Sequence, residues 1–128
     1  MIIRINTVST TPTYVQLRNE IVKGIGRGEL SEGECLPTVR QLAADLGVNS
    51  MTVSKAYQTL KAEGFIETDR RRGAIVRSGV QSGAQPDERF REKLEDELEL
   101  LSAEAKIKGL GREEFIHLCS MAFAGMEG

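Results

Sequence analysis

The sequence predicts a mainly α-helical fold that carries one small β-hairpin. Apolar residues recur at helical spacing in three successive segments before residue 65. Two short β-prone runs, FIET and AIVR, then flank the turn-forming stretch DRRRG, and a helical pattern returns after residue 86. A chain of 128 residues is long enough for one compact domain with a shorter extension.

The first helix is predicted to start with Thr11 as its N-cap and Pro12 at its first helical position. Four apolar residues then share one helical face: Tyr14, Leu17, Ile21 and Ile25. Gly26 and Gly28 are expected to end this helix. The preceding segment, MIIRINTVST, is expected to form a strand.

Two further helices are predicted, joined by a tight turn. Thr38 is expected to cap the second helix while the Gln41 side chain reaches back in a capping box. Gly47 supplies a left-handed residue at its end, Val48 anchors the turn, and Asn49 caps the third helix. The predicted inward faces are Val39, Leu42, Ala43 and Leu46 on the second helix and Val53, Ala56, Tyr57 and Leu60 on the third. This arrangement is a helix-turn-helix, and with the hairpin after it the domain is a winged helix.

The start of the third helix is the part that a helix-turn-helix offers to base edges in the major groove. Its residues are Asn49, Ser50, Met51 and Thr52. Their amide and hydroxyl groups can hydrogen-bond bases or phosphates, and a methionine can pack against a thymine methyl group. The alternative interpretation is that they only cap and begin the helix, with Met51 filling the core.

Basic residues near this helix favour contact with DNA. Arg40 lies at the start of the second helix, opposite its apolar stripe, and Lys55 follows one turn into the third helix. The wing turn contains Arg70, Arg71 and Arg72. Each can meet a phosphate, and arginine can also read guanine or enter a narrow minor groove. Three consecutive arginines repel one another without an anion, so we expect the wing to contact DNA.

The run from Pro12 to Val76 resembles the DNA-binding domain of the GntR family of bacterial transcription regulators. The motifs GELSEG, LPTVRQLA, LGVN, TVSKAY, L-x-x-EG and GAIV occur in the family's order and spacing. The resemblance implies that Arg40 makes a base contact, and it implies similar roles for the start of the third helix and for Gly73 in the wing. Thr38, Ser54 and Lys55 belong to these motifs and complete the predicted DNA contacts.

Two positions depart from the family pattern. Ser50 stands where the family often has arginine, and Arg71 stands where glycine is common in the wing turn. The resemblance therefore does not extend to base reading by Ser50 or to the backbone of the wing turn.

Residues 80–89, VQSGAQPDER, read as a linker, so the chain is predicted to divide into a winged-helix domain, 1–79, and a C-terminal region, 80–128. Residues 1–80 contain eleven Lys or Arg against eight Asp or Glu, and residues 81–128 contain six against eleven. The net charges of +3 and −5 suit one half that faces DNA and one half kept away from it.

The C-terminal region is predicted to form a long helix from Pro86 to Gly109 and a shorter one from Gly111. Two amphipathic helices without a third partner bury their faces poorly, so we expect a homodimer; packing on the chain's own winged helix is the alternative. The expected dimerisation residues are Phe90, Leu94, Leu98, Leu101, Ala105, Phe115, Leu118, Cys119 and Ala122. The short tail resembles the YtrA subfamily, which implies dimerisation and control of transporter operons, often with the regulator's own gene. It identifies no effector.

No catalytic, metal or cofactor site is predicted. Cys35 and Cys119 fit no metal or redox spacing and are expected to be reduced and partly buried, and His117 is the only histidine. No phosphate-binding loop occurs. With no apolar run near the ~20 residues of a membrane span and no signal-peptide pattern, we expect the cytoplasm as location.

The predicted function is a sequence-specific transcription regulator, a repressor that binds an inverted-repeat operator in double-stranded DNA as a homodimer. Two alternatives stay open. A plasmid replication or partition protein could use the same winged helix on iterated repeats. A protein-interaction module could have lost DNA binding, as the acidic net charge of −2 suggests.

Overall fold

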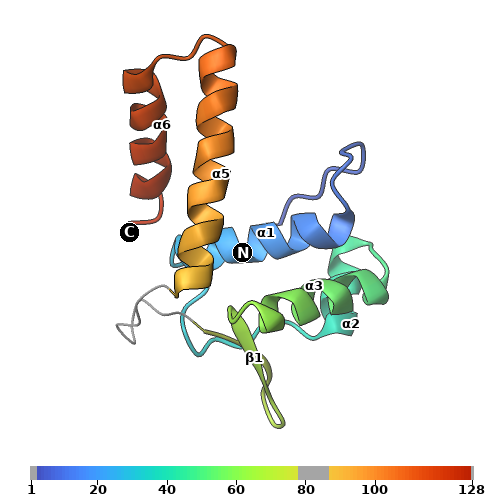
Figure 1. Ribbon diagram of the computed structural model, residues 1–128. Coiled ribbons are helices and arrows are strands. Elements are labelled where there is room, and N and C mark those ends of the chain that lie inside the picture. The colour runs from blue at the N-terminus through green and yellow to red at the C-terminus, as the bar shows by residue number, and fades with distance from the viewer. Residues whose placement is uncertain (1–2, 78–86, 128) are drawn as a thin grey trace. The chain divides into compact units, whose positions relative to one another are not determined.

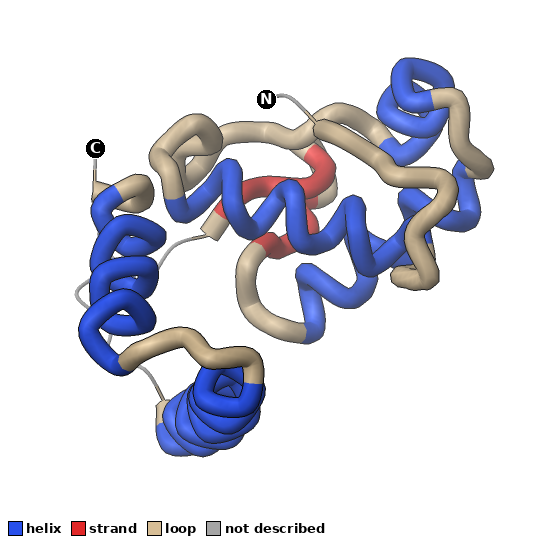
Figure 2. Tube along the Cα trace, turned by 90° about the horizontal axis from the view of Figure 1, so that it is seen from above, coloured by secondary structure: helices blue, strands red, loops and turns tan. Residues whose placement is uncertain are grey.

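The computed structural model describes residues 3–77 and 87–127, and the chain divides into two compact units, Met1–Gln81 and Ser82–Gly128. The first unit contains α1 (Thr13–Gly26), α2 (Val39–Leu46), α3 (Ser50–Ala62), β1 (Ile66–Asp69) and β2 (Gly73–Val76). The second contains α5 (Glu88–Ile107) and α6 (Arg112–Ala124) (Figure 1). Helices dominate both units and the two strands form one small hairpin (Figure 2), so the predicted fold class is confirmed.

The N-terminal segment forms no strand in the described residues, and the predicted strand is wrong. The Arg4 N–H donates to Glu20 Oε1 at 3.3 Å, and the Asn6 N–H donates to Gln16 Oε1 at 2.7 Å. Side-chain oxygens of α1 thus accept hydrogen bonds from backbone N–H groups that would pair with a neighbouring strand in a sheet. The apolar side chains of the segment pack against the core: Ile3 and Ile5.

The start of α1 also differs from the prediction. Pro12, rather than Thr11, occupies the N-cap position, and no side chain caps this end. The Pro12 carbonyl accepts the N–H groups of Val15 and Gln16 at 3.0 and 3.1 Å. The Gln16 side chain reaches back to the Thr11 carbonyl at 2.8 Å, which ties the entry of the helix to its first turn.

The core of the first unit is built around α3, which contacts α1, α2 and β1. The predicted inward faces are confirmed. Fully buried residues are Leu17 and Ile21 on α1, Leu42 and Ala43 on α2, and Val53, Ala56, Tyr57 and Leu60 on α3, with Tyr14, Ile25, Val39, Leu46 and Val48 packed at the margin. Each large aliphatic side chain stabilises the fold by about 1.5–3 kcal/mol on burial, so this cluster fixes how the three helices pack.

Residues 47–49 connect α2 to α3 and set the angle between them. The Thr38 hydroxyl accepts the Gln41 N–H at 3.1 Å, and Asn49 Oδ1 accepts the Met51 N–H at 2.7 Å, so both predicted N-caps are present. Only this half of the capping box forms in the described structure. Gly47 has a φ of +69°, a conformation that strains any residue with a β-carbon.

An ion pair ties α1 to the end of α3. Arg18 Nε and Nη2 donate to the two carboxylate oxygens of Glu63 at 2.8 and 3.0 Å. The Arg18 guanidinium also lies 5.4 Å from the centre of the Phe65 ring, just before β1. This bidentate contact holds the end of α3 where the hairpin begins.

The hairpin is the wing. Strand β1 begins one residue later than predicted, and strand β2 begins one residue earlier. Its antiparallel register runs from Ile66 opposite Val76 to Asp69 opposite Gly73. The loop before α2 adds a third backbone pairing, because Cys35 bridges to Ile75 on the other edge of β2. The second strand is therefore paired on both sides, with β1 and with the loop before α2.

The second unit is a helical hairpin in which α5 and α6 lie side by side (Figure 1). Asp87 caps α5 by accepting the Phe90 N–H at 2.7 Å, and Gly109, with a φ of +89°, follows its end. Of the predicted linker, residues 80–86 lie outside the described residues, and Glu88 and Arg89 belong to α5 instead. Within the described residues of this unit, none is buried.

Candidate nucleic-acid interface

A groove of about 390 Å³ lies between the start of α2, α3 and the wing. Its polar lining comes from all three elements: Thr38, Ser54, Gln58, Lys61, Thr68 and Arg72. Gln58, Lys61 and Thr68 are not among the contact residues predicted from the sequence. A signal for two of them was present, because Ser54, Gln58 and Lys61 recur at positions i, i+4 and i+7 and so share one face of α3.

The start of α3 presents its side chains outward. Met51 is 76% exposed and Ser50 is exposed, whereas Thr52 is half-buried. The interpretation that Met51 fills the core is therefore wrong. The side-chain oxygen of Asn49 accepts the capping hydrogen bond from the Met51 N–H. Its amide nitrogen makes no hydrogen bond within the described residues, so two N–H donors remain for an external acceptor.

Arg40 stands in the first turn of α2 and is exposed. It forms no ion pair or side-chain hydrogen bond in the part of the chain that the structure describes. Its guanidinium group therefore keeps all five donors, which suits bidentate contact with a guanine or a phosphate.

Lys55 is placed differently from Arg40. Its ammonium nitrogen lies 4.2 Å from the centre of the Tyr14 ring, so its charge rests on α1 in a cation–π contact. Any phosphate bound by Lys55 would have to approach the junction of α1 and α3.

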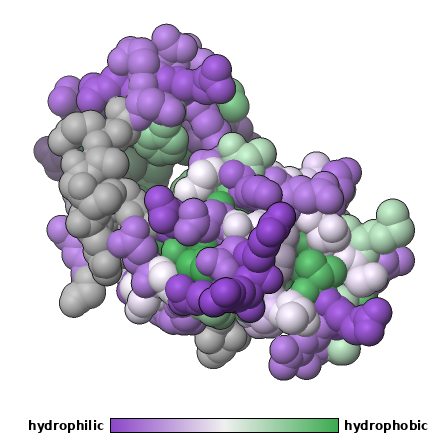
Figure 3. All heavy atoms as spheres, turned by 90° about the horizontal axis from the view of Figure 1, so that it is seen from below, coloured by the Kyte–Doolittle hydropathy of each residue, from purple (hydrophilic) through white to green (hydrophobic). Residues whose placement is uncertain are grey.

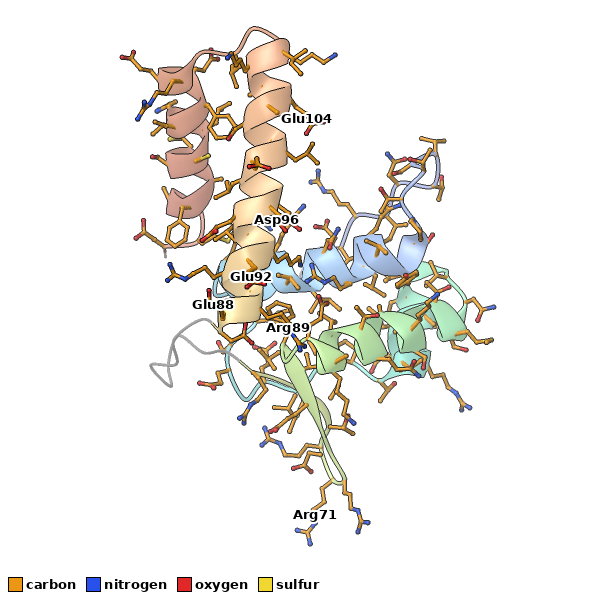
Figure 4. The ribbon with its side chains drawn as sticks, viewed as in Figure 1. Arg71, Glu88, Arg89, Glu92, Asp96 and Glu104 are labelled. Carbon is orange, nitrogen blue, oxygen red and sulfur yellow. The ribbon has the colours of Figure 1, made fainter. Side chains whose placement is uncertain are left out.

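The wing tip concentrates positive charge. Arg70, Arg71 and Arg72 are all exposed, and Arg71 points away from the domain at the end of the wing (Figure 4). Hydrophilic side chains cover the wing when it is viewed end-on (Figure 3). No residue other than glycine has a positive φ in the described residues, so Arg71 is unstrained where glycine is common, and Gly73, at +79°, supplies the left-handed turn.

Asp69 and Arg72 are tied into the wing by hydrogen bonds. Asp69 Oδ1 accepts the N–H groups of Arg71 and Arg72 at 2.8 and 3.1 Å. These two bonds hold the pKa of the Asp69 carboxyl below its usual value. Arg72 Nη2 donates to the Gly33 carbonyl at 2.6 Å.

The predicted dimerisation residues lie on α5 and α6. Phe90, Leu94, Leu98 and Leu101 are 47%, 42%, 40% and 53% exposed and form a stripe along α5. A groove of about 750 Å³ between the two helices brings Leu101 together with the remaining predicted residues: Ala105, Phe115, Leu118, Cys119 and Ala122. Both Cys35 and Cys119 are exposed, contrary to the expected partial burial.

No helix in the described residues is both long and apolar enough to cross a membrane. Residues 3–77 and 87–127 also contain no cluster of three His, Cys, Asp or Glu side chains that could hold a metal ion.

The sequence model of the bacterial regulatory proteins of the gntR family matches residues 13–76, which is half of the chain. The chain belongs to the GntR family. The relative YhcF of Bacillus subtilis, named an HTH-type transcriptional regulator, is 31% identical over 109 residues, which cover 84% of this chain and 87% of YhcF.

Two other relatives match mainly in the winged-helix region. The HTH-type transcriptional repressor YtrA of Bacillus subtilis is 39% identical over 80 residues, 62% of each chain. The HTH-type transcriptional regulator Rv1152 of Mycobacterium tuberculosis is 38% identical over 58% of this chain and 61% of that protein. The chain thus spans about three-fifths of the length of these two relatives.

A solved structure of a GntR-family protein agrees with this assignment. YtrA from Sulfolobus acidocaldarius, a GntR-family transcription factor, is 39% identical with a TM-score of 0.67 over 80% of this chain and 99% of its own. With the Bacillus relative, it places the chain in the YtrA subfamily. A transcriptional antiterminator from Listeria monocytogenes reaches a TM-score of 0.89 at 27% identity, covering 100% of this chain and 94% of its own.

The DNA-binding domain of AraR, solved in complex with operator ORR3, has a TM-score of 0.51 at 26% identity over 58% of this chain and 89% of its own. It is a structural neighbour that was solved on operator DNA. These relatives and structures are regulators rather than enzymes.

Proposed function

We propose that this GntR-family protein is a DNA-binding transcription regulator, a repressor that binds an inverted-repeat operator as a homodimer. One observation carries the proposal. The exposed start of α3 and the side chain of Arg40, which is unpaired within the described residues, belong to the two helices that line a single groove together with the arginine-rich wing.

In this proposal α3 enters the major groove with its N-terminal residues first. Arg40 reads a guanine, Met51 packs against a thymine methyl, and Asn49 uses its free amide donors on a base or phosphate. Contacts with the sugar-phosphate backbone of DNA come from the rest of the interface: Thr38, Ser50, Thr52, Ser54, Lys55, Arg70, Arg71 and Gly73. The structurally similar DNA-binding domain of AraR, solved in complex with an operator, supports DNA binding by this domain.

The homodimer is proposed to form through the region after residue 79. The apolar stripe on α5 and the groove beside α6 are too exposed to serve as an internal core. A second copy would cover both, and a two-fold symmetric dimer calls for a DNA site with the same symmetry. An inverted repeat follows from that symmetry.

The other side of α5 is acidic, with Glu88, Glu92 and Asp96 along the helix (Figure 4). Carboxylates repel the phosphate backbone, so this helix is suited to protein contacts and not to DNA contacts. The proposal that the protein represses transcription, and does not activate it, is taken from the relative YtrA, which is named a repressor. Control of a transporter operon and of the regulator's own gene is proposed from the same subfamily.

Selection from a random pool of duplexes tests the proposal. The purified protein should enrich an inverted repeat, and footprinting should show two protected half-sites in one promoter of its own genome. Enrichment of directly iterated repeats would point to a replication or partition role. No enrichment at all would contradict sequence-specific binding.

A further inference from the structure

The wing carries four adjacent charged residues, and the structure gives them two different environments. We propose that Asp69 and Arg72 position the wing, while Arg70 and Arg71 make its contacts with DNA. This inference rests on the proposed DNA-binding function and divides the work of the wing among named residues.

Asp69 acts on the shape of the turn. Its carboxylate accepts the N–H groups of Arg71 and Arg72 at 2.8 and 3.1 Å, and its backbone pairs with Gly73 at the last step of the hairpin. It forms no salt bridge within the described residues. Because both bonds go to backbone groups, the carboxylate closes the loop and does not merely neutralise a neighbouring arginine.

Arg72 ties the wing tip to the body of the domain. Its guanidinium group donates at 2.6 Å to the carbonyl of Gly33, and the Gly33 N–H donates at 2.9 Å to the carbonyl of Val76 on β2. Gly33 lies in the loop that leads to Thr38 and α2. Arg72 therefore connects the wing to the segment that carries the other wall of the groove.

Arg70 and Arg71 have no such partner. Neither side chain makes a hydrogen bond or salt bridge within the described residues, and Arg71 points away from the domain (Figure 4). A guanidinium group held at a carbonyl is restricted in position and has fewer donors left for DNA, whereas these two groups can turn toward phosphate with all their donors available.

A wing that worked through charge alone would behave differently. Each arginine would then contribute equally to the salt dependence of binding, and removal of the Asp69 carboxylate would strengthen binding. The positioning role predicts the opposite sign for a variant that loses the hydrogen-bond acceptor.

The first test compares Asp69→Ala with Asp69→Asn in the full chain. Both remove one negative charge, but only asparagine keeps a side-chain oxygen that can accept the two N–H groups. Binding is measured by fluorescence anisotropy on a labelled duplex of random sequence. Asp69→Ala should bind about three- to tenfold more weakly than Asp69→Asn, because the turn loses its hydrogen bonds. Equal or tighter binding by Asp69→Ala would overturn the role of Asp69.

The second test compares Arg71→Ala with Arg72→Ala across a series of salt concentrations. Arg71→Ala should lower the slope of log K against log salt by about 0.9 for each wing on the DNA, while Arg72→Ala should weaken binding with the slope nearly unchanged. Equal losses of slope would overturn the division.

Amide hydrogen exchange provides a readout without DNA. The Arg71 and Arg72 N–H groups should exchange faster in Asp69→Ala and stay protected in Asp69→Asn, in variants whose thermal unfolding shows an intact fold. Unchanged protection in Asp69→Ala would also overturn the proposal. If the wild-type chain binds no duplex at any salt concentration, the proposed function itself fails, which is a separate outcome.

Discussion

The hydroxyl group of Tyr57 donates a hydrogen bond of 2.8 Å to the carbonyl oxygen of Pro37. Tyr57 is buried at the centre of α3, and Pro37 directly precedes Thr38, the N-cap of α2. The bond therefore fixes the start of α2, and with it Arg40, against the helix proposed to enter DNA. A core side chain thus sets the geometry of the interface.

Removal of this bond should destabilise the domain. Tyr57→Phe leaves the Pro37 carbonyl without its donor, which we expect to cost about 1–3 kcal/mol in the free energy of unfolding, measured by urea denaturation. Tyr14→Phe is the matched control, because the Tyr14 hydroxyl makes no hydrogen bond within the described residues. A loss of stability no larger than that of the control would show that the Pro37 carbonyl is satisfied by another group.

The stability of the fold should also fall at alkaline pH. Burial raises the pKa of Tyr57 to about 12 from a normal 10.0, because the fold favours the neutral phenol. The folded state holds this proton more tightly than the unfolded state, so the contribution is complete below pH 10 and is lost as pH rises to about 12. Thermal unfolding across this range should show the decline, and Tyr57→Phe should reduce it. An identical decline in the variant would assign the effect to other groups.

The parts of the fold that follow from local signals were predictable. Thr38 and Asn49 cap their helices because a hydroxyl or amide at that position satisfies a free N–H group of the first turn. Gly47 takes the left-handed conformation because the turn requires it. The buried faces of α1 to α3 were also predictable, because the spacing of apolar residues within one helix determines which of its sides is apolar.

Contacts between residues far apart in sequence were not predictable. The N-terminal segment has the composition of a strand, but Glu20 and Gln16 of α1 capture its N–H groups. Two residues predicted to contact phosphate are instead held by other parts of the domain. Lys55 makes a cation–π contact with Tyr14, and Arg72 donates a hydrogen bond to the Gly33 carbonyl. No periodicity encodes such pairs, since each depends on the packing of separate elements.

Arg40→Ala should lose specific DNA binding. Loss of a bidentate guanine contact should cost about 1–3 kcal/mol and relax base preference at one position in each half-site. Arg27→Ala, which removes an exposed cation at the C-terminal end of α1, is the matched control and should keep the preference. Mobility shifts on the selected sequence and its single-base variants measure both quantities. Unchanged affinity and preference in Arg40→Ala would refute the base contact.

Leu98→Glu should split the dimer. Leu98 lies in the apolar stripe of α5, where burial of each large side chain would stabilise by about 1.5–3 kcal/mol and a buried carboxylate would oppose association. Leu100→Glu is the control, because Leu100 is 63% exposed and lies outside that stripe. Sedimentation should find a monomer for Leu98→Glu and a dimer for Leu100→Glu. A dimeric Leu98→Glu would move the interface elsewhere.

The most direct measurement of the central claim is the affinity and stoichiometry of the wild-type chain on a full inverted repeat and on a single half-site. The tail should convert contact with the second half-site into an intramolecular event. We therefore predict two chains on each full duplex and an affinity at least about 100-fold above that for the half-site. One chain on each full duplex, or equal affinity for the two, would contradict a homodimeric regulator held together by its C-terminal helices.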